Sequence, residues 1–74
     1  MKNIVTVTIP ETLDGEHITW TAQVCETGHV TLFRDDTLAG VGRWNGRAIE
    51  DCPVDAPDHV FTRLDAAIAA VTLA

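Results

Sequence analysis

Hydrophobic and polar residues alternate at the start of the chain with the period of two that is typical of β-strands. In residues 3–9, valine and isoleucine occupy the odd positions after Asn3, and threonine occupies positions between them. This pattern predicts a β-branched strand with one solvated side. We expect Pro10 to end this strand and Asp14-Gly15 to form the turn that follows.

The same alternation is stronger in residues 16–25, where Trp20 falls on the apolar face. We therefore expect a second strand that carries a buried tryptophan. Residues 29–34 predict a third strand, reached through a tight turn at residues 26–28. The sequence does not determine which side chains of this strand face the core, because Leu32 and Phe33 are adjacent and both apolar.

Asn45-Gly46 predicts a hairpin between a strand at residues 38–44 and a strand at residues 47–51. A two-residue loop of this type places Trp44 opposite Arg47. One face of the hairpin then carries Leu38, Gly40, Gly42, Trp44 and Ile49. The two glycines leave a shallow groove on this face, and we expect the backbone of a helix to approach it closely.

A helix is predicted at about residues 56–72, with Asp55 as the N-cap, Pro57 in the first turn and Asp58 at the third position. Apolar residues then recur at helical spacing: Val60, Phe61, Leu64, Ala67, Ile68 and Val71. Together these elements predict a single α+β domain over residues 1–74. It is an antiparallel β-meander of four to five strands, with one C-terminal helix packed on one face.

The charge of the chain is strongly negative, since 11 Asp and Glu residues face 5 Lys and Arg residues, giving a net charge of −6. This charge disfavours direct binding to nucleic acid or to an anionic membrane, because their phosphates would be repelled. It favours a basic protein partner, or solubility alone. The chain has no apolar stretch long enough to span a membrane and no signal-peptide pattern at its start, so we expect a cytoplasmic protein.

A meander places alternate loops at the same end of the sheet, and these loops are rich in carboxylates. We expect a negatively charged end that binds a partner, formed by Glu11, Asp14, Glu16, Asp35, Asp36, Glu50 and Asp51. Carboxylates spaced in this way can present a field like that of nucleic-acid phosphates to a basic groove. The alternative interpretation is that these residues are ordinary solvated turn and cap residues, and the sequence leaves both open.

Residues capable of catalysis or metal binding are few and poorly spaced. Cys25 and His29 lie near each other across a turn, but no orienting carboxylate is evident in the sequence. The two cysteines and three histidines lack the spacing of a zinc site. We therefore predict no catalytic residue, no metal site and no cofactor. Cys25 and Cys52 are expected at opposite ends of the sheet, as two free thiols.

The chain resembles the small inhibitors encoded by phages and mobile elements, above all the anti-CRISPR proteins. The resemblance lies in its size, acidity and sheet-plus-helix architecture over the whole chain. No family motif is present, so no residue role can be carried over. The resemblance implies a protein that occupies a basic nucleic-acid-binding surface of an effector complex by DNA mimicry, in the host cytoplasm if the gene is phage-encoded.

Three functional hypotheses follow from these observations. The leading one is a non-enzymatic inhibitor or adaptor that docks on a basic protein surface. The second is a structural or adaptor protein that forms a homo-oligomer by pairing its edge strand, residues 3–9, with another chain. The third, a small metal-binding protein or enzyme, has the least support, and metal analysis of the purified protein would test it.

Overall fold

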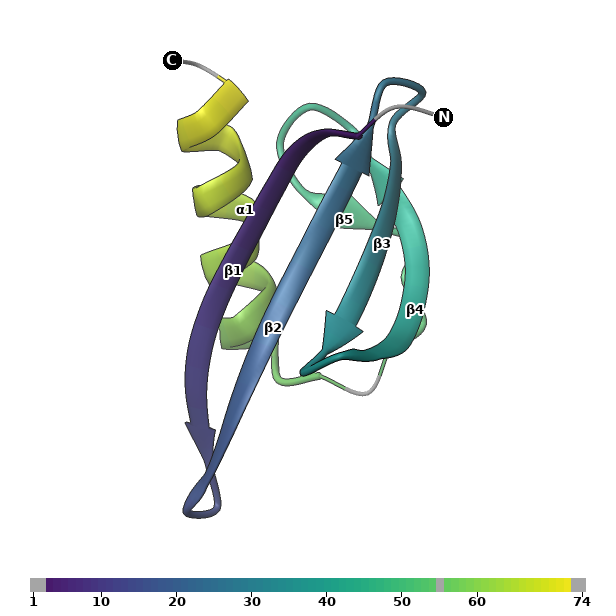
Figure 1. Ribbon diagram of the computed structural model, residues 1–74. Helices are drawn as coiled ribbons and strands as arrows, with labels where there is room; N and C mark the ends of the chain where they lie inside the picture. The colour runs from purple at the N-terminus through teal and green to yellow at the C-terminus, as the bar shows by residue number, and fades with distance from the viewer. Residues whose placement is uncertain (1–2, 55, 73–74) are drawn as a thin grey trace.

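The described part of the chain folds into one curved antiparallel sheet with a single helix beside it, as Figure 1 shows. The computed structural model describes residues 3–54 and 56–72. Its elements are β1 (Asn3–Leu13), β2 (Glu16–Cys25), β3 (His29–Arg34), β4 (Thr37–Trp44), β5 (Ile49–Glu50) and α1 (Asp58–Thr72). The strand order β1-β2-β3-β4-β5 confirms the predicted α+β meander with a C-terminal helix.

The hydrophobic core lies between the inner face of the sheet and α1. β1 and β2 contribute alternate residues, as their period of two predicts, and Trp20 is only 2% exposed. The helix contributes Val60, Leu64 and Ile68, each fully buried, and it packs mainly against β1. Val71, predicted to face the core, is instead 51% exposed because it lies beyond the packed part of the helix.

β1 does not end at Pro10 as predicted but continues to Leu13, paired with β2 over its whole length. Pro10 is tolerated because β1 is an edge strand. Its carbonyl oxygen accepts a hydrogen bond from Arg63, on the side away from β2. In an antiparallel strand the N–H and C=O of one residue point to the same side, so the missing N–H of Pro10 removes no bond to β2.

The predicted two-residue loop at Asn45-Gly46 is also wrong, because Trp44 pairs with Ile49 and not with Arg47. The side-chain Oδ1 of Asn45 accepts hydrogen bonds from the backbone N–H groups of Arg47 (2.8 Å) and Ala48 (2.9 Å). These bonds close a longer loop over residues 45–48. As a result β5 is confined to Ile49–Glu50.

The inner face of β4 differs from the prediction at Leu38. The pairing register shifts between Leu32 and Phe33, so that Leu32 lies opposite Gly40 while Phe33 lies opposite Leu38. This bulge inserts Ala39 as an extra residue and breaks the alternation. Leu38 is therefore 60% exposed instead of sharing the buried face with Gly40.

The two glycines of β4 accommodate residues 52–54, and not the helix as predicted. A Cβ atom at Gly42 would stand 2.6 Å from the Cβ of Cys52, and one at Gly40 would clash with the side chain of Val54. The chain after β5 thus runs back along β4 toward the start of α1, filling the groove that the glycines leave.

The helix starts at Asp58, two residues later than the predicted position 56. Pro57 precedes the helix and accepts a hydrogen bond from the N–H of Val60 through its carbonyl (3.0 Å), and Asp58 lies in the first turn. The predicted N-cap, Asp55, lies outside the described residues. In the described part of the chain, no helix has both the length and the apolar character that a membrane crossing requires.

Candidate functional site

The acidic residues of the turns divide between two ends of the sheet. The β1–β2 turn, with Asp14 and Glu16, lies at the same end as the β3–β4 turn, with Asp35 and Asp36. These four residues are exposed, and we call them the acidic end. The β1–β2 hairpin projects farthest, since residues 16–19 of β2 lie beyond Trp20, the last residue of β2 that pairs with β3 at this end.

Glu50 and Asp51 do not belong to the acidic end, which corrects the prediction from the sequence. Glu50 pairs with Arg43, and its Oε2 accepts a hydrogen bond from the side chain of Asn45 (3.1 Å). Cys52, the residue after Asp51, contacts Gly42, so Asp51 also lies toward the opposite end. Both residues come at the start of the run along β4, level with Arg43 and Gly42, and only the later residues up to Val54 approach the acidic end.

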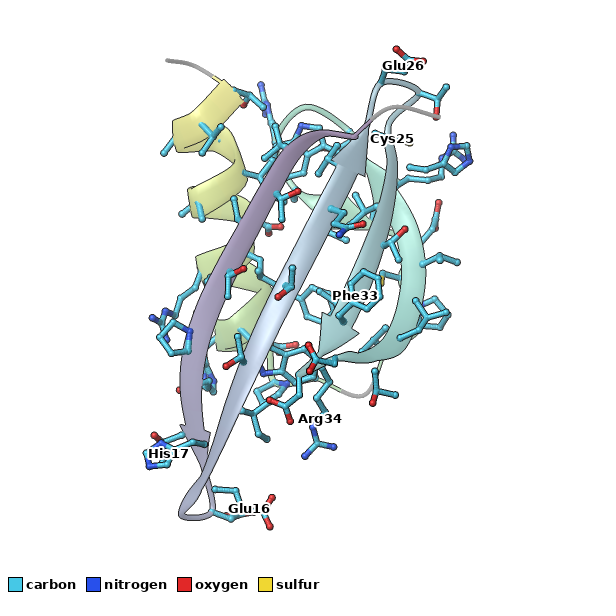
Figure 2. The ribbon with its side chains drawn as sticks, viewed as in Figure 1. Glu16, His17, Cys25, Glu26, Phe33 and Arg34 are labelled. Atoms are coloured by element: carbon cyan, nitrogen blue, oxygen red, sulfur yellow. The ribbon has the colours of Figure 1, made fainter. Side chains whose placement is uncertain are left out.

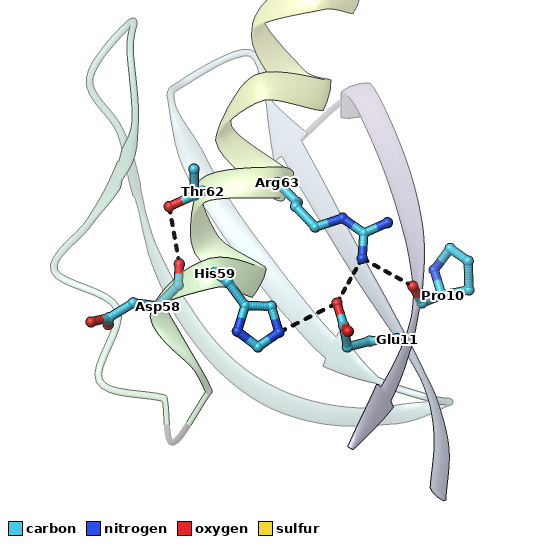
Figure 3. Close-up of polar contacts among 6 residues, drawn as sticks. All are labelled: Pro10, Glu11, Asp58, His59, Thr62 and Arg63. Carbon is cyan, nitrogen blue, oxygen red and sulfur yellow. Dashed lines mark hydrogen bonds and ion pairs between the residues drawn. The ribbon is translucent and has the colours of Figure 1, made fainter. Parts of the chain in front are cut away.

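Glu11 is engaged within the fold and is not free to bind a partner (Figure 3). Its Oε2 lies 2.6 Å from Nη1 of Arg63 and 3.5 Å from Nε2 of His59, both on α1. Its side chain is only 15% exposed. Burial alone would raise the pKa of Glu11, but the hydrogen bond from Arg63 and the nearby charge of His59 outweigh it and hold the pKa below its usual value.

Asp35 combines a structural role with its place at the acidic end. Its Oδ1 accepts a hydrogen bond from the backbone N–H of Thr19 (3.0 Å), and its own N–H donates to the carbonyl of Thr19 (2.7 Å). Its backbone has a positive φ of 53°, a conformation that Asp tolerates better than most residues. Asp35 therefore joins the β3–β4 turn to β2.

Three carboxylates of the acidic end remain available to a partner. Within the described part of the chain, the side chains of Asp14, Glu16 and Asp36 form no hydrogen bond or ion pair. Of the seven residues predicted as a binding surface, these three are exposed, unpaired and gathered at one end.

The face of the sheet opposite α1 is uncovered, and Figure 2 shows its side chains toward the viewer. Thr21 lies opposite Phe33, and Thr31 lies opposite Val41, which is 58% exposed. We call these four residues the open face. The sequence left the orientation of Phe33 undetermined, and the structure resolves it: Leu32 is buried in the core and Phe33 lies on the open face.

A shallow hollow of about 230 Å³ joins the open face to the acidic end. Its lining comprises Thr21, Gln23, Phe33, Asp35 and Asp36. An aromatic ring therefore lies beside two carboxylates. This combination suits an arginine or lysine side chain, whose apolar stem packs on the ring while its charged group meets the carboxylates. The sequence reasoning missed Phe33, and its adjacency to Leu32 was the only signal.

Cys25 is linked to His29 through Thr27. The Sγ atom of Cys25 lies 3.1 Å from Oγ1 of Thr27, which lies 2.8 Å from Nδ1 of His29. The hydrogen bond with Thr27 lowers the pKa of the Cys25 thiol, against the effect of burial, whereas burial raises the pKa of Cys52. Cys25 is only 7% exposed, which leaves little access for a substrate.

Both cysteines are free, although the expected reason is wrong. Cys52 lies beside Gly42, which is level with Val30 on β3 and Val24 on β2, so the two cysteines are not at opposite ends. They are separated sideways instead, because β3 lies between β2 and β4. Two strand spacings amount to roughly 10 Å, beyond the reach of a disulfide of about 7 Å between Cα atoms.

Among residues 3–54 and 56–72, no group of three or more Asp, Glu, His or Cys side chains is arranged to hold a metal ion. Comparison with profiles of known protein families, with curated proteins and with solved structures found no match. The arrangement of the site itself is therefore the basis for a functional proposal.

Proposed function

We propose that this protein is a non-enzymatic binding protein that docks on a basic protein surface through its acidic end and open face. The hollow beside Phe33 is the observation that carries the proposal, since it brings an aromatic ring and the carboxylates of Asp35 and Asp36 together. An apolar centre with a charged margin is the usual composition of a protein–protein interface.

The overall charge supports the same proposal. A net charge of −6 attracts a basic partner over distances of about a Debye length, roughly 10 Å at 0.1 M salt. The exposed, unpaired residues Asp14 and Glu16 lie at the β1–β2 turn, the end of the projecting hairpin, where such a partner would first meet them. Charge at the margin accelerates association, while the apolar contact at Phe33 holds the complex.

In its most specific form, the proposal is that the partner is a nucleic-acid-binding effector complex and that the protein inhibits it by DNA mimicry, as the resemblance to anti-CRISPR proteins implies. A basic groove that binds phosphates would accept the carboxylates of the acidic end in their place. Duplex DNA would then compete with the protein for the same partner.

Affinity capture with matched charge reversals tests the proposal. The tagged protein and its Asp36→Lys and Glu26→Lys variants are used to capture partners from extracts of the native host at low and high salt. Glu26 is an exposed carboxylate in the β2–β3 turn, at the other end of the sheet, and serves as the control.

We expect a partner that is retained by the wild type and by Glu26→Lys, and lost with Asp36→Lys and at high salt. Release of that partner by duplex DNA would support mimicry, whereas retention in the presence of DNA would limit the proposal to protein binding. Equal capture by all three proteins would reject the acidic end as the binding surface.

A second candidate function is self-association through β1. The strand order places β1 at one edge of the sheet, where a second copy could pair with it. Pro10 and the hydrogen bond from Arg63 to its carbonyl restrict that edge to the first part of the strand. Sedimentation of the purified protein distinguishes the candidates, because a tight homodimer without a basic partner would favour self-association.

A further inference from the structure

A second pocket, distinct from the hollow at Phe33, lies between the β3–β4 turn and the segment that runs back along β4. It has a volume of about 440 Å³, within the usual range for small-molecule sites. Leu38, Ala39 and Val54 form its apolar side. Trp20, Arg34, Asp35 and Thr37 also line it.

Trp20, which lines this pocket, carries an unsatisfied hydrogen-bond donor. The residue is 2% exposed, and its indole Nε1 is buried without an acceptor in the described structure. Buried N–H groups nearly always have a partner, because leaving one unpaired lowers stability. An acceptor supplied from outside the chain would satisfy this donor.

Arg34 provides a positive charge next to the indole. Arg34 and Trp20 are directly paired across β3 and β2, so their side chains leave the sheet on the same face as near neighbours. Arg34 is exposed, and it takes part in no ion pair among residues 3–54 and 56–72. A buried N–H beside an unpaired guanidinium is suited to a group with two acceptor oxygens and a negative charge.

We propose that this pocket binds a small aliphatic carboxylate. One carboxylate oxygen accepts the indole N–H of Trp20 and the other meets the guanidinium of Arg34, while the hydrocarbon part packs on Ala39 and Val54. Asp35 lines the same pocket, with its Oδ1 already accepting from Thr19. A ligand that also carries an ammonium group, such as an α-amino acid, would meet this second carboxylate.

The indole N–H resonance of Trp20 reports binding directly. The chain has 2 tryptophans, so a Trp44→Phe variant assigns the signal. In this background, isovalerate is titrated at millimolar concentrations, with isoamyl alcohol, which has the same carbon skeleton and no carboxylate, as the matched control. We expect a saturable shift with isovalerate and binding weaker by roughly tenfold or more with the alcohol.

Arginine variants separate this site from general charge effects. Arg34→Gln is expected to weaken isovalerate binding by roughly tenfold or more, and Arg43→Gln, an exposed arginine on β4, to leave it unchanged. Leucine, tested alongside, identifies the ligand type: tighter binding than isovalerate assigns an amino acid, and weaker binding assigns a simple carboxylate.

The absence of a saturable shift with both ligands, or equal affinities for the wild type and Arg34→Gln, would overturn the proposal. Neither result would bear on the docking surface, whose test uses Asp36 and not Arg34. Far-UV circular dichroism of each variant shows whether the fold is retained.

Discussion

At the scale of single residues, the aspartates of this chain serve the backbone as well as the surface charge. Asp14, Asp35 and Asp51 have positive φ angles of 51°, 53° and 53°, and they are the only described residues besides glycine with this conformation. Asp is one of the few side chains that adopt it readily. Part of the acidity of the chain is therefore explained by its turns, independently of any partner.

Asp35 allows the structural and charge roles to be separated. Asp35→Asn keeps an oxygen for the N–H of Thr19 and a side chain that tolerates positive φ, so we expect little change in stability. Asp35→Ala loses both and is expected to lower the free energy of unfolding by about 1–2 kcal/mol. Urea denaturation of both variants measures the difference, and equal stability of the two would contradict the structural role.

Glu11 predicts a pH-dependent contribution to stability. Because its folded pKa lies below the usual value, the contribution is fully present above the unfolded pKa and is lost as pH falls through the folded one. The Glu11→Gln variant should therefore be less stable than the wild type at neutral pH. The two proteins should converge in strongly acidic solution, as measured by urea denaturation across the pH range.

Glu16→Gln is the matched control for this experiment, since Glu16 is exposed and unpaired in the described structure. It should change the free energy of unfolding at neutral pH by less than about 0.5 kcal/mol. A constant gap between Glu11→Gln and the wild type at all pH values would show that the ion pairs with Arg63 and His59 contribute nothing.

At the scale of elements, periodicity predicted the strands and the helix well where one face of the sheet is buried against one face of the helix. It failed where side-chain hydrogen bonds or a β-bulge altered the backbone locally. The Asn45 side chain holds a longer loop than its neighbour Gly46 suggested, and the bulge at Ala39 reverses the facing of Leu38. Such changes arise from hydrogen bonds and pairings between strands, which a single-residue pattern does not contain.

The candidate site was predictable only in part, for the same reason. Asp14, Glu16 and Asp36 are exposed as the meander predicted. The internal engagement of Glu11 depends on Arg63, which is far away in the sequence and reaches β1 only because α1 packs there. The hollow at Phe33 likewise needs the register of β2 and β3, which fixes Thr21 opposite Phe33.

Gly42 is the position where β4 is least tolerant of a side chain. An added Cβ would stand 2.6 Å from the Cβ of Cys52 and 2.9 Å from the carbonyl oxygen of Glu50. Gly42→Ala is therefore expected to lower the free energy of unfolding by about 1–3 kcal/mol. Val41→Ala, at the exposed neighbouring position, should change it by less than about 0.5 kcal/mol in a parallel urea denaturation.

At the scale of the whole molecule, α1 supplies all the buried core residues that lie outside the sheet in the described part of the chain. Leu64 is fully buried at its centre, so Leu64→Ala should lower the free energy of unfolding by about 2–5 kcal/mol. Because sheet and helix share this core, helical circular dichroism and tryptophan fluorescence should change at the same urea concentration.

Val71→Ala controls for loss of side-chain volume on the same helix, because Val71 is 51% exposed. It should move the unfolding midpoint much less than Leu64→Ala. If fluorescence and circular dichroism reported separate transitions in the wild type, the helix would be folding independently of the sheet, against the shared core.

The packing of α1 on β1 has a consequence for biosynthesis. The ribosome makes β1 before every other described element and α1 after all of them, yet these two lie against each other. While the hairpins form in order, the apolar side of the nascent meander stays exposed to solvent. It is covered only when the helix has left the exit tunnel. Chaperones that recognise extended apolar strands would therefore find their target on the growing chain and lose it once the helix has emerged and packed on β1.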